Sequence, residues 1–278
     1  IGYLFISSVD FPIERIEHNI LFYILIAVAI SPTLKTTSTY KKTRLLNSLF
    51  ISFVIFCSVL GIIRHKGEVH TTSAKLYKGK QYWQRIISEI QKAYIPYLYE
   101  IDRSSTPLHW YSGVAKFSLG QQKRAFDDFK LAHSLNPNHL HVLNNLGTCY
   151  QLNGNSHKAK KYYNKALSIS PRFEEASVNL AAVLFNEGKI QESLNVILRC
   201  NIEKDKSKYN TYLKTIILKL IDESIAEGVI TSTEMKKLID LKSEINSDFE
   251  KVKKEFRNIY NLKKTDSNHY LNLYIKNY

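Results

Sequence analysis

The chain has 278 residues, of which 44% are hydrophobic, and its formal net charge is +14. This length accommodates one ordinary soluble domain and a membrane segment. The basic residues are spread along the whole chain, which favours attraction to a lipid surface and argues against a nucleic-acid partner. Cys57, Cys149 and Cys200 have neither metal-binding nor redox spacing, so we expect small buried hydrophobic side chains and no metal or cofactor.

The first residues are apolar and uncharged. Ile1–Val9 contains no Lys or Arg, whereas a secretory signal needs a basic region before its apolar core. The single methionine of the chain is Met235. We therefore expect the C-terminal part of a longer protein, with a processed product as the alternative.

Two apolar runs follow. Leu45–Ile63 has nineteen residues without a charge, close to the length that crosses the hydrocarbon core of a bilayer. Asn19–Leu34 is shorter and is interrupted by Pro32, and its closeness to the second run predicts a pair of spans. We thus expect a transmembrane segment at 1–66, with a periplasmic loop at about 10–18 and spans at about 19–34 and 45–63.

The charges around the two runs predict their orientation. The loop Ser31–Arg44 carries four basic residues and no acidic one, so the positive-inside rule places it in the cytoplasm. Basic residues between Arg64 and Lys80 point the other way, but large exported domains cross the membrane largely regardless of such charge. We expect a multi-pass protein of a bacterial inner membrane with its C-terminal two-thirds in the periplasm.

Small residues and prolines recur at a spacing of 34 in the middle of the chain. The recurring residues are Gly113 and Gly147; Gly120, Gly154 and Gly188; Ala125 and Ala159; Ala132 and Ala166; Pro137 and Pro171. This pattern resembles the tetratricopeptide repeat, a helical hairpin of this length. We expect three such repeats at 106–205, with hairpins at about 106–138, 139–172 and 173–205. Gly120 and its equivalents should end each first helix in a left-handed conformation.

The segments beside the repeats are also predicted to be helical. Residues 67–105 read as a polar linker followed by a capping helix that breaks near Pro96, and 206–278 as further helices and a tail. Within the latter, an apolar stripe predicts one long helix at 231–262 that packs on the last repeat, with a coiled-coil partner as the alternative. The predicted fold class is all-α, with transmembrane helices, a tetratricopeptide-type α-solenoid and additional C-terminal helices.

The concave face of such an array is formed by the first helix of each hairpin. We expect it to be lined by Trp110, Val114, Asn144, Thr148, Val178 and Phe185. These side chains would suit a short peptide or a helix from another protein. The alternative is that the C-terminal helices of this chain fill the groove. The Lys, Arg and Asn pattern that grips a free C-terminal carboxylate is absent from these helices, which argues against a chaperone adaptor.

The sequence predicts no catalytic residue in the soluble part. His139 and His141 are two residues apart, and on a helix they would face different sides, so we expect surface residues and no metal site. Arg15 and His18 lie three apart in the predicted periplasmic loop and could face one phosphate-bearing substrate. The alternative is that Glu14, Arg15 and Glu17 hold the helix at the membrane interface by local ion pairs.

The order of these parts resembles the C-terminal end of the O-antigen ligase and polymerase family in its Bacteroidetes form. The resemblance is carried by VDFPIERIEHNILF at 9–22, the pair of spans, and STPLHWYSGVAKFSLG, HVLNNLGTCYQLNGN and SPRFEEASVNLAAV in the repeats. It implies a metal-independent glycosyltransferase whose partners are the lipid bilayer, an undecaprenyl-pyrophosphate-linked glycan and a protein bound through the repeats.

The family's catalytic arginines and histidine lie in earlier segments, so no catalytic residue is carried over to this chain; Arg15 and His18 fall in a different, later loop. The alternative hypothesis is a membrane-anchored tetratricopeptide scaffold without enzymatic activity.

Overall fold

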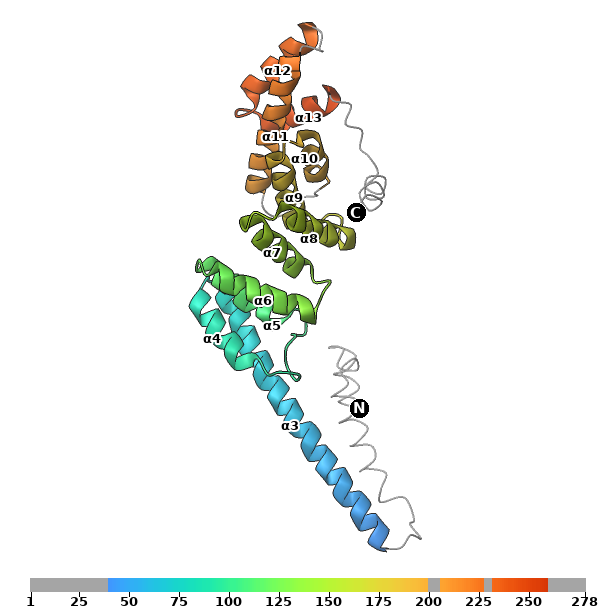
Figure 1. The fold of residues 1–278 in the computed structure, drawn as a ribbon. Coiled ribbons are helices and arrows are strands. Elements are labelled where there is room, and N and C mark those ends of the chain that lie inside the picture. The colour runs from blue at the N-terminus through green and yellow to red at the C-terminus, as the bar shows by residue number, and fades with distance from the viewer. Residues whose placement is uncertain (1–39, 200–205, 228–231, 260–278) are drawn as a thin grey trace.

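The computed structural model describes residues 40–199, 206–227 and 232–259, and every regular element in these ranges is a helix (Figure 1). The helices stack into an elongated array from which one long helix projects. In chain order they are α3 (Tyr40–Gly79), α4 (Trp83–Ala93), α5 (Leu108–Ser118), α6 (Gln122–Leu135), α7 (Leu140–Leu152), α8 (Ser156–Ile169), α9 (Glu174–Asn186), α10 (Ile190–Ile197), α11 (Lys206–Glu227), α12 (Ser232–Glu244) and α13 (Phe249–Ile259).

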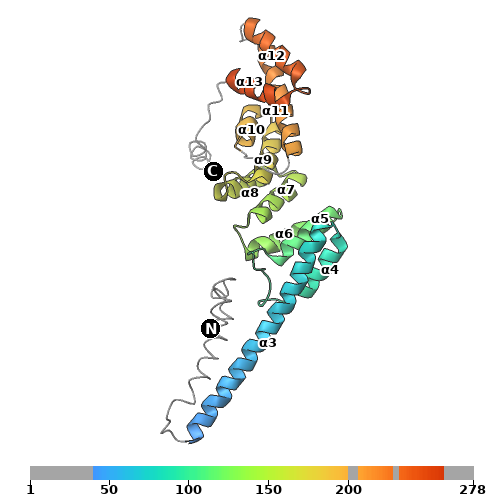
Figure 2. The same ribbon diagram turned by 180° about the vertical axis from the view of Figure 1, so that it is seen from behind.

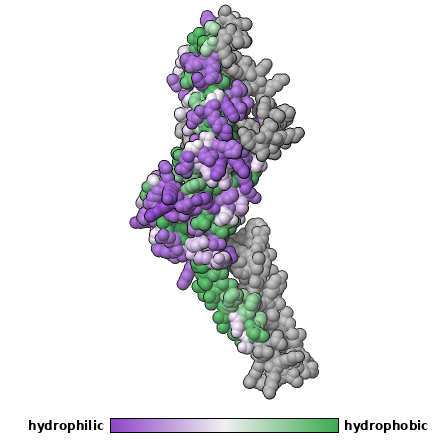
Figure 3. Space-filling view, in the orientation of Figure 1, coloured by the Kyte–Doolittle hydropathy of each residue, from purple (hydrophilic) through white to green (hydrophobic). Residues whose placement is uncertain are grey.

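Helix α3 is one uninterrupted helix of 40 residues, about 60 Å long at 1.5 Å per residue. Most of its apolar side chains from Leu49 to Ile62 are exposed, while Val54, Cys57 and Leu60 are half-buried, and its projecting part is the hydrophobic end of the surface in Figure 3. Among the described residues, 48–79 is the one helical stretch that is long and apolar enough to cross a membrane, by length and composition alone. The predicted first span and the loop at 10–18 lie outside the described residues.

The predicted linker after residue 66 is wrong in its first half. Helix α3 continues through 67–79 because no proline interrupts it and because its second half packs against α4. The helix therefore joins the apolar run directly to the folded array (Figure 2).

Helices α5 and α6, α7 and α8, and α9 and α10 form three successive hairpins, which confirms the predicted all-α repeat. The first helices end at Ser118, Leu152 and Asn186, at the expected spacing of 34. Helix α5 begins later in its repeat than α7 and α9 do, because Pro107 is its N-cap residue. A proline at this position lacks only a backbone N–H that would have no partner inside the helix.

The turn glycines behave as predicted. Gly120, Gly154 and Gly188 have φ values of +76°, +74° and +77°, the left-handed conformation that glycine adopts at low cost. In each case the backbone N–H of the glycine or its successor returns to a carbonyl of the preceding helix. Each first helix therefore stops at a fixed residue and the chain reverses.

Glycines inside the first helices let the paired helices approach closely. A Cβ built on Gly113 would lie 2.6 Å from Phe129 Cε1, and one on Gly147 would overlap the ring of Tyr163. Both rings are fully buried, as are the interhelical alanines Ala125, Ala132, Ala159 and Ala166. The third hairpin has Ala181 and the smaller Ile197 at the corresponding positions, both fully buried. The predicted role of these small residues is confirmed.

Helix α4 forms a further hairpin with the second half of α3. It packs on α3 and on α5, and the turn after it places the Tyr99 ring on Gly67, whose missing Cβ would lie 2.5 Å from Tyr99 Cδ1. This contact repeats the glycine–ring arrangement of the next two hairpins. The expected capping helix is therefore the second helix of a hairpin that precedes the predicted repeats.

The buried carboxylate of Asp102 connects α3 with the first predicted repeat. Its oxygens accept hydrogen bonds from the backbone N–H groups of Ser104 and Thr106 at 2.8 and 3.0 Å, and from the Tyr111 hydroxyl at 2.8 Å. Lys75 of α3 lies 2.7 Å from Asp102 Oδ2. Burial raises the pKa of Asp102, but the bonds from Lys75, Tyr111 and Thr106 outweigh it and hold the pKa below its ordinary value.

The C-terminal helices continue the array. Helix α11 packs against α10 and α9, and α12 packs on α11. The apolar stripe is buried as predicted, through Leu238, Leu241, Ile245, Val252 and Phe256. The single long helix expected there is wrong, because residues 245–248 form a turn. Asp248 accepts the backbone N–H of Lys251 at 3.0 Å and so caps a new helix, α13.

We predict that Gly147→Ala lowers the free energy of unfolding by about 1–3 kcal/mol, because the added methyl group overlaps the Tyr163 ring in a closely packed hairpin. The matched control is Gly79→Ala, since a Cβ at Gly79 has no atom within 4 Å and should change stability by less than about 1 kcal/mol. Urea unfolding followed by circular dichroism measures both. Equal stabilities would contradict the close-approach explanation.

Candidate interaction surface and buried polar cluster

The predicted groove residues all lie on first helices, as a concave face requires. Trp110 and Val114 belong to α5, Asn144 and Thr148 to α7, and Val178 and Phe185 to α9. Trp110 and Val178 are buried, with 8% and 4% of their surface exposed, and the other four are half-buried. The structure therefore brings the six residues onto one series of helices, and none of them projects freely.

The two polar side chains of the groove are bonded within the protein. Asn144 Oδ1 accepts a hydrogen bond from Asn179 Nδ2 at 2.9 Å, which joins α7 to α9. The Thr148 hydroxyl donates to the Asn144 carbonyl at 3.1 Å and accepts from the Tyr163 hydroxyl at 3.2 Å. A partner at this surface would share acceptors that already hold neighbouring helices together.

The α9 end of the first-helix face adjoins the C-terminal helices. Val178 belongs to the same buried cluster as Leu213 and Ile217 of α11, and Phe185 packs against that cluster. At this end the structure favours the alternative in which the chain's own helices fill the groove. The half-buried side chains of Val114, Asn144 and Thr148 leave the middle of the face more accessible.

Trp110 is the centre of an aromatic cluster that includes both histidines. Its ring centroid lies 5.9 Å from His139 and 5.5 Å from His141, and Lys78 Nζ lies 4.6 Å from its centroid. The expectation that the histidines face different sides is wrong, since their ring centroids are only 5.9 Å apart, but His141 is exposed as expected and His139 is half-buried. His139 is not helical: it is the N-cap of α7, with ψ of 117°, and its Nδ1 accepts the Val142 N–H at 3.3 Å.

Burial lowers the pKa of both histidines. For His139, desolvation is the main cause, followed by repulsion from His141; for His141, desolvation is again first, and Glu175 opposes it. A neutral His139 fits its capping role, because Nδ1 accepts a hydrogen bond only when it is unprotonated. Within the described ranges, no group of His, Cys, Asp and Glu residues has an arrangement that could hold a metal ion.

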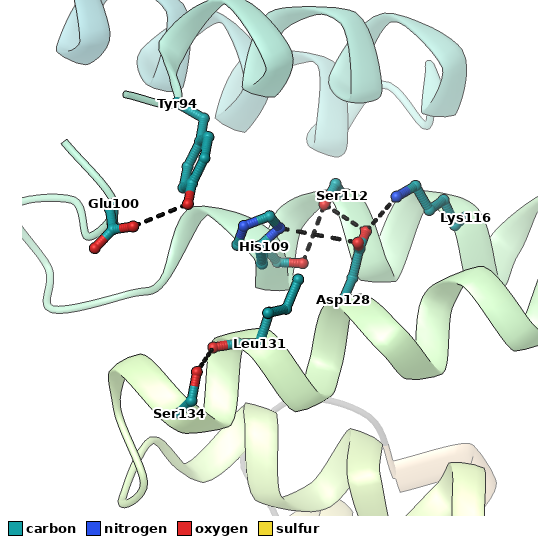
Figure 4. Close-up of polar contacts among 8 residues, drawn as sticks. All are labelled: Tyr94, Glu100, His109, Ser112, Lys116, Asp128, Leu131 and Ser134. Carbon is teal, nitrogen blue, oxygen red and sulfur yellow. Dashed lines mark hydrogen bonds and ion pairs between the residues drawn. The ribbon is translucent and has the colours of Figure 1, made fainter. Parts of the chain in front are cut away.

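A buried polar cluster lies inside the first predicted hairpin (Figure 4). Asp128 of α6 accepts hydrogen bonds at Oδ2 from the Ser112 hydroxyl and from Lys116 Nζ, each at 2.6 Å. His109 Nδ1 lies 3.8 Å from Asp128 Oδ1. Desolvation lowers the pKa of His109, although Asp128 opposes the effect. Beside the cluster, the Tyr94 hydroxyl donates to Glu100 at 2.8 Å.

The geometry of this cluster suits structure rather than catalysis. The Ser112 hydroxyl is directed to a carboxylate that Lys116 already neutralises, and His109 approaches that carboxylate rather than the hydroxyl. A nucleophile would need a base within hydrogen-bond reach of its own oxygen.

Sequence reasoning missed this cluster, although the period of 34 contains the signal. The positions of His109, Ser112 and Lys116 correspond to apolar or aromatic positions in the second hairpin, namely Leu143, Leu146 and Tyr150.

The sequence-predicted residues Arg15 and His18 lie outside the described residues. Cys149 is buried, and desolvation raises the pKa of its thiol to about 11, which fits the predicted small hydrophobic role. The successive hairpins, in which a ring packs on a glycine of the paired helix, and the face formed by their first helices define a helical-repeat protein of the solenoid type.

One segment of the chain matches a known repeat family. The family model described as "Tetratricopeptide repeat" matches residues 142–173, which include most of the second hairpin. The chain is similar to the photosystem I assembly protein Ycf3 of Rippkaea orientalis, with 28% identity over 85 residues, or 30% of this chain and 49% of that protein. The chain thus spans about half the length of this curated relative.

Solved structures with similar arrangements include a tetratricopeptide repeat protein from Parabacteroides merdae, at 14% identity and a TM-score of 0.48, covering 71% of this chain and 74% of that one. Another is MamA from Desulfovibrio magneticus, at 10% identity and a TM-score of 0.45, covering 72% and 98%.

We predict that Asp128→Ala lowers the free energy of unfolding by about 2–4 kcal/mol, because it leaves Ser112 and Lys116 without their shared acceptor in a buried site. The neighbouring Asp127→Ala is the matched control, since Asp127 is exposed and pairs only with Lys130 across the surface. Thermal unfolding should separate the two variants. A similar melting temperature for both would show that the cluster contributes nothing.

We also predict that the protein loses stability as the pH falls below about 6.5. His109, His133, His139 and His141 all have folded-state pKa values lowered first of all by desolvation, so the unfolded chain binds more protons in this range. The stabilisation is complete above the unfolded pKa and is lost as the pH falls through it towards the folded values.

Melting temperatures measured from pH 8 to pH 5 test this prediction. His139→Asn keeps a capping side chain and removes one titrating group, so it should reduce the acid-induced loss. An unchanged slope in that variant would contradict the role given to His139.

Proposed function

We propose that the protein is a membrane-anchored tetratricopeptide scaffold, which α3 holds to the bilayer while the first-helix face binds a protein partner. The observation that carries this proposal is the continuity of α3. One helix contains a largely exposed apolar half and also supplies the first helix of the folded array. Exposure of that much apolar side chain to water is unfavourable, and a bilayer removes the cost.

The charges beside the apolar run fit the same arrangement. Arg64, His65 and Lys66 follow its last residue and are exposed on α3. Basic side chains at this level meet the phosphates of lipid headgroups. The inner-membrane location and the periplasmic position of the array, inferred from the basic loop at 31–44, are part of the proposal.

The scaffold hypothesis has more support than glycan transfer. The glycosyltransferase hypothesis rests on the family resemblance and on residues such as Arg15 and His18, which lie outside the described residues. The family model that matches this chain describes a helical repeat, and the curated relative is a photosystem assembly protein; neither is a ligase or polymerase. Repeat arrays of this kind present an extended face to other proteins.

The middle of the first-helix face is the part that suits a partner. Val114 of α5 and Thr148 of α7 are half-buried there, between the Trp110 cluster and the region covered by α11. An extended peptide or a helix with small apolar side chains would fit this mixed surface. Lys78 on the Trp110 ring and Glu175 beside His141 place two opposite charges at the Trp110 end of this face.

We predict that the double variant Ile55→Lys/Val59→Lys floats less with lipid vesicles than the parent chain, because two charges in the centre of the span are costly to bury. The matched control is Val69→Lys/Leu76→Lys on the same helix, beyond the apolar run. All four parent side chains are between 48% and 65% exposed, so neither change disturbs the core. Equal flotation of both variants would contradict an anchor at 45–63.

The partner is tested in the same membranes. A photoreactive residue at Val114 should cross-link a discrete protein, whereas one at Leu131, an exposed position on the second helix α6, should not. Equal labelling at both positions would argue against a specific first-helix site.

A further inference from the structure

The turn after α4 lies beside α3, just beyond the end of its apolar run. Helix α4 runs back along α3 from the turn near Gly79, so that Glu89 meets His70 at 2.7 Å and Tyr99 meets Gly67. Arg103, farther along the same connection, pairs with Glu68. Figure 1 shows this connection at the base of the array, on the side from which α3 projects.

The contact between the Tyr99 ring and Gly67 fixes the position of this turn along α3. Gly67 follows Ile63, the last residue of the apolar run, by four positions, which is about 6 Å along a helix. The headgroup layer on each side of a bilayer is roughly 5–8 Å thick. If the apolar run spans the hydrocarbon core, the turn therefore lies in the headgroup layer.

The residues at the tip are unusual for a turn in water. The Leu98 N–H returns to the Ile95 carbonyl at 3.1 Å, which closes a four-residue turn with Pro96 and Tyr97 in its middle. Tyr97 has a φ of +64°, a conformation that favours glycine, yet it carries a large aromatic ring that is 96% exposed. Leu98 beside it is 41% exposed. Neither exposed side chain contributes to the core of the array.

The surroundings suit a lipid surface. Lys66 of α3 is exposed one residue before Gly67, and Lys92 of α4, which pairs with Glu89 at 2.8 Å, is exposed as well. Tyrosine is enriched at membrane interfaces because its ring is apolar and its hydroxyl can remain hydrated among the headgroups. Basic side chains around such a ring add attraction to lipid phosphates.

We propose that the turn Ile95–Tyr99 is a second membrane contact, in which Tyr97 and Leu98 enter the headgroup region beside α3. This inference rests on the proposed membrane anchor. A single helix can rotate and tilt, whereas two contacts fix the direction in which the array leaves the bilayer. The first-helix face would then have a constant orientation relative to the membrane.

The experiment uses the full 278-residue chain in vesicles of phosphatidylcholine and phosphatidylglycerol. Tyr97→Trp is compared with Leu152→Trp, an exposed position at the end of α7. Fluorescence is measured with ordinary lipids and with lipids brominated near the headgroup. The native Trp83 and Trp110 form a constant background near the far end of α3, about 24 Å beyond Ile63 at 1.5 Å per residue.

The expected result is a blue shift and quenching of the added fluorescence in Tyr97→Trp, with neither in Leu152→Trp or in the parent chain. Unchanged melting temperatures ensure that both variants are folded. A Tyr97→Trp variant that floats with the vesicles but is not quenched overturns the second contact while the anchor stands. A parent chain that fails to float overturns the anchor itself, and the second contact falls with it.

Discussion

The distance between paired helices depends on the seating of an aromatic ring on a glycine. Phe129 rests on Gly113 and Tyr163 on Gly147, and in both cases a Cβ would enter the ring; Tyr99, in the connection after α4, rests on Gly67 in the same way. The ring fills the space that the missing side chain leaves, so the two helices approach more closely than most side chains would allow. Once these distances are set, the alanines at 125, 132, 159 and 166 can be fully buried between neighbouring helices.

The same constraint makes α3 part of the array. Because Tyr99 is seated on Gly67 and Asp102 is bonded to Lys75, the second half of α3 is joined to the first repeat by packing and by charge. The apolar half of α3 then has no flexible linker between it and the folded helices. The orientation of the array is therefore set by the orientation of the apolar half of α3.

The sequence predicted the features that follow from local backbone chemistry. The turn glycines at 120, 154 and 188, and the glycines beneath Phe129 and Tyr163, could be recognised in the sequence because they recur at a spacing of 34. The features that the sequence did not predict depend on packing between the elements. Helix α3 passes residue 66 because α4 covers it, and His139 meets His141 because a cap residue is extended. The turn at 245–248 interrupts a stripe whose spacing alone is compatible with one helix.

The candidate site also combines features that the sequence predicted with features that depend on packing. The groove residues could be assigned to first helices from the repeat period, but their burial depends on Asn179 and on α11, which the period does not contain. The polar cluster adds a further constraint. A buried carboxylate is tolerated only where donors match it, and Ser112 and Lys116 match Asp128 of their own hairpin. The second hairpin offers Leu143 and Leu146 instead, so an exchange of partners between similar hairpins would leave buried polar groups unpaired.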